Sequence, residues 1–170
     1  MIENIFKSAV IHQNKKNFSK ARRIYEELLK TNPQNLVILQ NYAILLSQVK
    51  EFKKSENIFK KCLKIKPKDP LLLYNYGKFF HDQKIFDKAV RFYKESFDLD
   101  KKNYLAVYNI GNIFLSESKF DQAIEFFKKA IEINSSNPRA YNNMGIAHKR
   151  LGNFNEALEF YKEAIERDNN

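Results

Sequence analysis

The chain repeats itself every 34 residues, and this period constrains the fold more than any other feature of the sequence. Phenylalanine recurs at this spacing without insertion or deletion, at Phe18, Phe52, Phe86, Phe120 and Phe154. Three more columns share the period, two of small and one of aromatic residues: Ala9, Ala43, Gly77, Gly111, Gly145; Ala21, Ser55, Ala89, Ala123, Ala157; and Tyr25, Phe59, Tyr93, Phe127, Tyr161. Five repeats, at residues 2–35, 36–69, 70–103, 104–137 and 138–170, therefore predict one repeat domain over residues 1–170. The phenylalanines and the aromatic column are predicted to fill its core.

Each repeat contains two helical patterns, because its apolar residues recur at spacings of three and four. In the second repeat they are Leu39, Tyr42, Ala43 and Leu46, then Ile58, Phe59, Cys62 and Leu63. The sequence thus predicts an all-α chain of ten antiparallel helices.

Capping residues support these helices. A first helix is predicted to start after each of Asn35, Asp69, Asn103 and Asn137. A second cap is predicted at Ser19, Asp87, Asp121 and Asn155, with Lys53 as the exception in the second repeat. Pro33 and Pro67 are predicted to end the second helices of the first two repeats.

The residues of the last repeat resemble the tetratricopeptide repeat, through Tyr141, Met144, Gly145, His148, Ala157, Tyr161 and Ala164. The resemblance covers all five repeats and implies a right-handed α-solenoid with a concave groove lined by the first helices. It also implies a non-catalytic scaffold that binds a protein partner. Counting positions from residue 2, the chain departs from the family at position 4, where no repeat has Trp, and at position 27, where Leu28 replaces a small residue.

The charge, the cysteine count and the apolar stretches of the chain indicate which kinds of partner and location to expect. The formal charge is +10, but 24 of the 30 basic residues are lysine, whereas arginine is the preferred phosphate reader, so nucleic acid is an unlikely partner. The lysines of the second repeat form either a solvated face or a patch for an acidic partner or RNA: Lys53, Lys54, Lys60, Lys61, Lys64. The lone Cys62, the absence of a signal peptide and apolar stretches of only four residues predict a cytoplasmic protein that spans no membrane.

No residue pattern predicts catalysis. His12 and His148 share position 11 with Leu46, Phe80 and Phe114, so packing roles are expected, while His81 is placed on the groove. Cys62 occupies the small position 27, which favours a structural thiol. No nucleophile, metal or phosphate motif is present, and no enzyme activity, cofactor or metal is expected.

Position 6 of the first helices reads Asn in four repeats, at Asn41, Asn75, Asn109 and Asn143. Positions 2, 5, 6, 9, 12 and 13 are expected to face the groove, since positions 4, 7, 8 and 11 are needed for the core. Stacked amides suit the alternating C=O and N–H groups of an extended peptide. A similar asparagine ladder lines the repeats of O-linked N-acetylglucosamine transferase, where it binds the substrate backbone, and the resemblance implies that role here.

Apolar residues flank this ladder and are predicted to anchor a ligand: Val37, Ile44, Leu71, Tyr74, Leu105, Tyr108, Leu115. The predicted site also includes Asn112 and the cations Lys78 and Arg139. With Lys149 and Arg150, these cations indicate either an acidic ligand or a solvated rim.

The last helix pair is expected to expose Leu158, Phe160 and Ile165. Repeat arrays usually need a polar cap, so the chain is expected to be part of a larger protein or to self-associate through its C-terminal hairpin, as a symmetric dimer. Two function classes follow: a scaffold that binds an extended peptide, or a repeat region that positions or oligomerises an enzyme such as a transferase.

Overall fold

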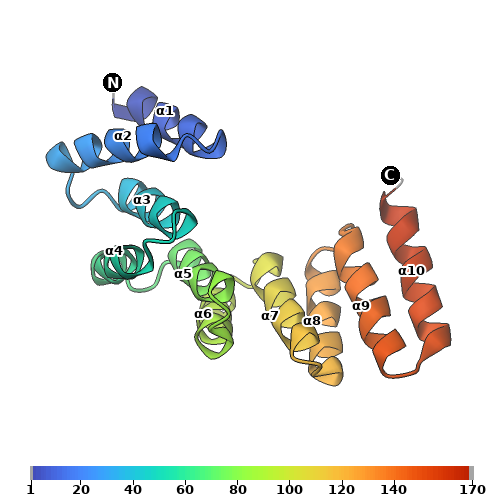
Figure 1. The fold of residues 1–170 in the computed structure, drawn as a ribbon. Helices are drawn as coiled ribbons and strands as arrows, with labels where there is room; N and C mark the ends of the chain where they lie inside the picture. Colours follow the sequence, from blue (N-terminus) through green and yellow to red (C-terminus); the bar gives the residue numbers. More distant parts are fainter. Residues whose placement is uncertain (1, 169–170) are drawn as a thin grey trace. The chain divides into compact units, whose positions relative to one another are not determined.

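A computed structural model describes residues 2–168. These residues form ten α-helices and no strand, as the apolar spacing predicts (Figure 1). The first helices of the five repeats are α1 (Ile2–Asn14), α3 (Leu36–Gln48), α5 (Pro70–Asp82), α7 (Tyr104–Ser116) and α9 (Pro138–Arg150). The second helices are α2 (Phe18–Thr31), α4 (Phe52–Ile65), α6 (Phe86–Leu99), α8 (Phe120–Ile133) and α10 (Phe154–Asp168).

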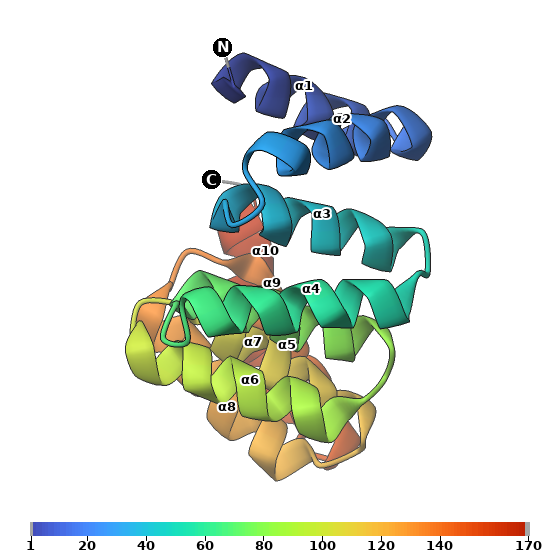
Figure 2. The same cartoon turned by 90° about the vertical axis from the view of Figure 1, so that its left-hand side faces the viewer.

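The chain divides into two compact units, residues 1–79 and 80–170, with the boundary inside α5. In the first unit α1 packs on α2, α3 on α4, and α2 on α3. Figure 2 shows that α1 and α2, and likewise α3 and α4, run antiparallel. In the second unit α7 packs on α8, α9 on α10, α6 on α7 and α8 on α9, so consecutive hairpins contact one another within each unit.

The four predicted caps of the first helices are confirmed. The Asn35 side chain accepts a hydrogen bond from the Ile38 amide at 3.2 Å, and Asp69 accepts one from Leu72 at 2.8 Å. Asn103 and Asn137 do the same for the first turns of α7 and α9. Each cap satisfies one of the amide donors that a helix leaves unpaired at its start.

The predicted caps of the second helices are wrong. Ser19, Asp87, Asp121 and Asn155 lie inside the first turn, because these helices start at the repeated phenylalanine, which directly precedes each predicted cap. Asn17 is the true cap of α2 and accepts from the Lys20 amide at 3.4 Å, while Glu51, Ile85 and Lys119 make no capping side-chain bond. Inside the first turn, the acidic residues Asp87 and Asp121 instead interact favourably with the helix dipole.

Backbone hydrogen bonds close the turn within each repeat. The residue at position 15 adopts a left-handed conformation, at Lys16, Lys50, Lys84, Ser118 and Gly152. The amide at position 16 then donates to the carbonyl at position 11, as from Glu51 to Leu46 at 2.8 Å and from Lys119 to Phe114 at 2.9 Å. This backbone closure fixes where the second helix begins, so a side-chain cap is not required there.

The aromatic column at position 24 forms the core. Tyr25, Tyr93 and Phe127 are completely buried, and Phe59 is 1% exposed. The phenylalanines at position 17 are less buried than predicted: Phe120 is only partly buried and Phe154 is 68% exposed. They lie at the helix start, next to the turn, and so at the edge of the core.

Candidate peptide-binding surface

Position 2 of the first helices is apolar and exposed in repeats two, three and four. Val37 is 56% exposed, Leu71 61% and Leu105 40%, although all three side chains are large and apolar. Arg139 occupies this position in the last repeat and is also exposed. These side chains are exposed and therefore not part of the core.

In the first unit, the predicted site residues lie on α3 and α5. Asn41 is half-buried, and its amide nitrogen Nδ2 donates to the Val37 carbonyl at 2.9 Å within its own helix. Asn75 Nδ2 donates to Gln40 Oε1 at 3.3 Å, which links the third repeat to the second. Tyr74 is half-buried beside Asn75 in sequence, and Lys78 is exposed one turn further along α5.

In the second unit, the site residues lie on α7 and α9. Asn143 Nδ2 donates to Asn112 Oδ1 at 2.8 Å and contacts the Tyr108 hydroxyl at 3.1 Å. Asn109 is half-buried at the equivalent position of α7. The structure thus brings Tyr108, Asn112 and Asn143 together across two repeats.

The asparagines therefore have a structural role as well as a predicted binding role. Asn75 and Asn143 each use an amide donor to join consecutive first helices. A neutral hydrogen bond of this kind contributes about 1 kcal/mol, so replacing either residue perturbs repeat stacking as well as any ligand contact.

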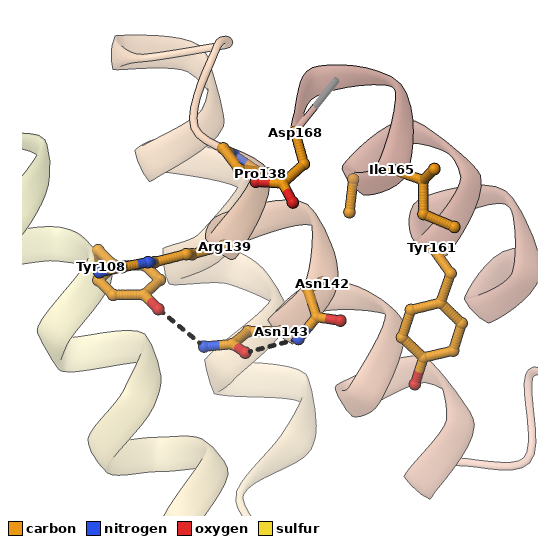
Figure 3. Close-up of a pocket in the computed structure, with 9 residues that line it drawn as sticks. Tyr108, Pro138, Arg139, Asn142, Asn143, Tyr161, Ile165 and Asp168 are labelled. Atoms are coloured by element: carbon orange, nitrogen blue, oxygen red, sulfur yellow. Dashed lines mark hydrogen bonds between the residues drawn. The ribbon is translucent and has the colours of Figure 1, made fainter. Parts of the chain in front are cut away.

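A pocket of about 470 Å³ opens beside Asn143, between α7, α9 and α10 (Figure 3). Polar groups line one side, from Tyr108, Arg139, Asn142 and Asn143, and Asn142 donates to Asn143 at 3.4 Å. Tyr161, Ala164 and Ile165 of α10 form the apolar side. This arrangement can hold an apolar side chain of a ligand and leave hydrogen-bonding groups for its backbone.

Among the first helices of repeats two to five, only α9 has a net positive charge. Helices α3 and α7 contain no charged residue. Helix α5 carries Lys78 and Asp82, and α9 carries Arg139, Lys149 and Arg150. These helices thus carry four cations and one carboxylate, and three of the cations lie on α9.

Position 12 contacts its own repeat in the first and third repeats, whereas Lys149 at this position of the last repeat is exposed. Gln13 is only 7% exposed and accepts from the Tyr25 hydroxyl at 2.8 Å, and His81 lies 3.3 Å from the Tyr93 hydroxyl. The polar side chain at position 12 is thus a partner for a tyrosine at position 24 of the same repeat. Positions 3 and 10, which the sequence reasoning left out of the core, are buried in repeats two to five, as at Ile38, Leu45, Ala106 and Ile113.

The remaining candidates for chemistry have packing roles. The His148 ring stacks on Phe160 at a centroid distance of 5.2 Å, and both ring nitrogens are buried without a hydrogen-bond partner in residues 2–168. Cys62 is buried, and burial raises the pKa of its thiol to about 11, which disfavours the reactive thiolate. No cluster of three metal-ligating side chains occurs among the described residues.

The lysines of the second repeat are exposed on α4 and the turn beside it. Lys54 pairs with Glu51 at 2.7 Å and Lys60 pairs with Glu56 at 2.8 Å, and in both pairs the lysine is exposed while the glutamate is partly buried. Such pairs are typical of a solvated face. None of the helices in residues 2–168 has the length and apolarity needed to span a bilayer.

The geometry defines an all-α repeat protein whose packed hairpins display one face of their first helices. Models of the tetratricopeptide repeat match residues 15–78, 73–103 and 138–170, and a TPR repeat model matches residues 111–152. The chain belongs to the tetratricopeptide repeat family.

Solved structures share this fold. The chain is 24% identical to MamA, with a TM-score of 0.82, and the match covers 95% of this chain and 94% of MamA. It is 20% identical to PilF of Pseudomonas aeruginosa, with a TM-score of 0.87 over 98% of this chain and 76% of that chain. PilW, titled a widely conserved type IV pilus biogenesis factor, is 19% identical, with a TM-score of 0.85 over 99% and 78%. No curated protein sequence matches the chain. At these identities the likeness concerns the fold, and the partner must be inferred from this chain's own surface.

Proposed function

We propose that this protein is a non-catalytic scaffold that binds an acidic, extended segment of a partner protein on its first-helix faces. The observation that carries the proposal is the surface of these helices. Exposed apolar residues occur at position 2 and half-buried amides at position 6 in successive first helices, and these helices carry four cations and one carboxylate. A cytoplasmic setting is part of the proposal, supported by the unpaired thiol of Cys62.

The apolar residues, the cations and the asparagine amides each bind a different part of the ligand in this proposal. Leu71 and Leu105 contact apolar side chains of the ligand, and the pocket beside Asn143 holds one of them. Lys78 and Arg139 attract its carboxylates and raise the association rate. The asparagine amides bond its backbone, and each exchanges or shares an intramolecular bond to do so. This exchange makes the amides selective for an extended chain, whose C=O and N–H groups replace the lost partners.

Selection from a random-peptide display library tests the proposal, with the immobilised chain as bait. The selected peptides are expected to be rich in Asp and Glu between apolar residues. Their affinity is expected to fall at least about tenfold for Lys78→Glu/Arg139→Glu, since each reversal places like charges together.

The matched control is Lys53→Glu/Lys128→Glu, which makes the same charge change on exposed residues of second helices, one in each unit. The control is expected to bind as the wild type does. Selected peptides without acidic enrichment, or equal losses in the two double variants, would refute the proposed surface.

A further inference from the structure

Helix α10 carries a stripe of apolar side chains on its outer surface. Its members are Phe154, Leu158, Tyr161 and Ile165, of which Phe154 is 68%, Leu158 54% and Ile165 62% exposed. Their spacing of four, three and four residues places them within about 60° of one another around the helix. Contiguous exposed apolar surface of this kind is uncommon on a monomeric protein and marks an interaction site.

The equivalent positions in the other repeats show what this surface is suited to contact. In the first unit, Phe59 at position 24 stacks on Tyr76 at a centroid distance of 5.0 Å and lies 5.5 Å from Phe79. Phe79 also contacts Phe52 at position 17, at 6.4 Å. Side chains of a following helix thus cover positions 17 and 24. In the second unit Ile124, the equivalent of Leu158, is only 9% exposed. The stripe on α10 is therefore a surface that this fold covers with a helix.

Helix α1 of a second copy is a poor occupant. At positions 3 and 7, where a first helix meets the preceding repeat, it has Asn4 and Ser8. The third repeat has Leu72 and Tyr76 there, both 3% exposed or less. Head-to-tail stacking would bury the Asn4 amide and the Ser8 hydroxyl against apolar side chains, which is unfavourable without hydrogen-bond partners.

Helix α10 is complementary to itself. If two copies pair antiparallel about a two-fold axis, Leu158 of one lies opposite Tyr161 of the other, and Phe154 lies opposite Ile165. Lys162 lies about 70° and Glu159 about 130° from the middle of the stripe, on the same side of the helix. Both are exposed, and neither forms an ion pair with another described residue. The two-fold axis brings this side of the helix next to its own copy, so that the long Lys162 side chain of each copy can extend towards Glu159 of the other. We propose that this chain forms a symmetric dimer through the α10 stripe.

The size of the contact sets the expected strength. Helix α10 has 15 residues, so the paired length is about 22 Å. One helix pair of this length is at the low end of specific interfaces, below about 1,200 Å² in total. The dimer is therefore expected to dissociate in the micromolar range. The stripe shares Tyr161 and Ile165 with the pocket beside Asn143, so dimer formation and filling of that pocket compete.

Sedimentation equilibrium of residues 1–170, without peptide, tests the dimer independently of the proposed ligand. The mass is expected to rise from 20.2 kDa towards about 40 kDa between about 5 and 500 µM protein. Leu158→Glu is expected to keep the mass at 20.2 kDa throughout. The control Ile11→Glu, on an exposed apolar residue of α1, is expected to leave dimerisation unchanged. A monomer mass for the wild type at every concentration, or equal loss in both variants, would overturn the proposal.

A charge swap tests the antiparallel register. Glu159→Lys places two lysine pairs across the axis and is expected to raise the dissociation constant at least about fivefold. Adding Lys162→Glu restores both pairs and is expected to restore wild-type affinity. A double variant no stronger than Glu159→Lys would contradict this register. Far-UV circular dichroism confirms that each variant is folded.

Discussion

Gly111→Ala tests the packing of the fourth repeat most sharply. A Cβ atom at Gly111 would lie 2.6 Å from Cε1 and 2.7 Å from Cδ1 of Phe127, much closer than van der Waals contact. The Phe127 ring cannot move aside easily, because it is completely buried and packs against the Tyr108 ring, with 5.9 Å between the ring centroids. Position 8 is not closed to a methyl group in general, since the first two repeats have Ala9 and Ala43 there.

Two opposing effects decide the change in unfolding free energy. Overpacking costs about 1–3 kcal/mol, whereas replacing glycine by alanine inside a helix gains about 1 kcal/mol. Gly111→Ala is thus expected to be between neutral and about 2 kcal/mol destabilising. In a Phe127→Leu background, where the ring edge is absent, Gly111→Ala is expected to stabilise the protein by nearly the full gain of about 1 kcal/mol for replacing glycine by alanine in a helix. The expected coupling between the two sites is about 1–3 kcal/mol.

Urea unfolding followed by far-UV circular dichroism measures the four corners of this double-mutant cycle. Gly145→Ala is a useful comparison, because its Cβ would meet the Tyr161 ring at 2.7 Å, and that ring is only half-buried and can swing outwards. The same Cβ would also lie 3.1 Å from the Ala157 carbonyl oxygen, which has to shift by only a few tenths of an ångström. Gly145→Ala is therefore expected to be less unfavourable than Gly111→Ala. Additive effects at Gly111 and Phe127, within about 0.5 kcal/mol, would refute the packing argument.

Three further outcomes are expected. His148→Phe should raise the free energy of unfolding by about 1 kcal/mol, because it removes two buried ring nitrogens that have no hydrogen-bond partner. Phenylalanine already packs at the same position in Phe80 and Phe114. A loss of stability in the urea assay would contradict this prediction. The hydrogen bond from Arg22 lowers the pKa of Glu51 from 4.5 to about 2, so the stabilising effect of this ion pair is complete above pH 4.5 and is lost as the pH falls towards 2. Glu51→Gln should therefore reduce the pH dependence of thermal unfolding over this range. An unchanged pH profile would count against the ion pair. Cys62 should react with a thiol reagent at pH 8 only as fast as the chain opens, and faster with urea; rapid labelling of the native protein would show that the thiol is accessible.

The 34-residue period was enough to predict the helices, the hairpins and the first-helix caps, because each depends on local spacing and capping chemistry. The starts of the second helices could not be read from acidic residues such as Asp87. A left-handed residue and a backbone hydrogen bond fix those starts, and lysine at Lys50 or Lys84 gives no sequence signal of positive φ.

The candidate site was predicted in part. The exposed column at position 2 followed from helical phase alone. The role of position 12 depended on its tertiary partner, since Gln13 and His81 each contact a tyrosine hydroxyl twelve residues later. A polar residue at position 12 wherever position 24 is tyrosine, as at Gln13 and His81, was the available signal. The bonds of Asn75 and Asn143 between repeats also needed the structure, because they join residues more than 30 positions apart.

In the proposed function, the first-helix faces hold an extended partner chain through their asparagine amides. NMR spectra of the side-chain NH₂ groups, recorded while a display-selected acidic peptide is added, test it most directly. Shifts at Asn41, Asn75, Asn109 and Asn143 that saturate with the peptide are predicted, while Asn57 on the second helix α4 stays unchanged. Saturable binding that leaves all four ladder amides unshifted would contradict the account.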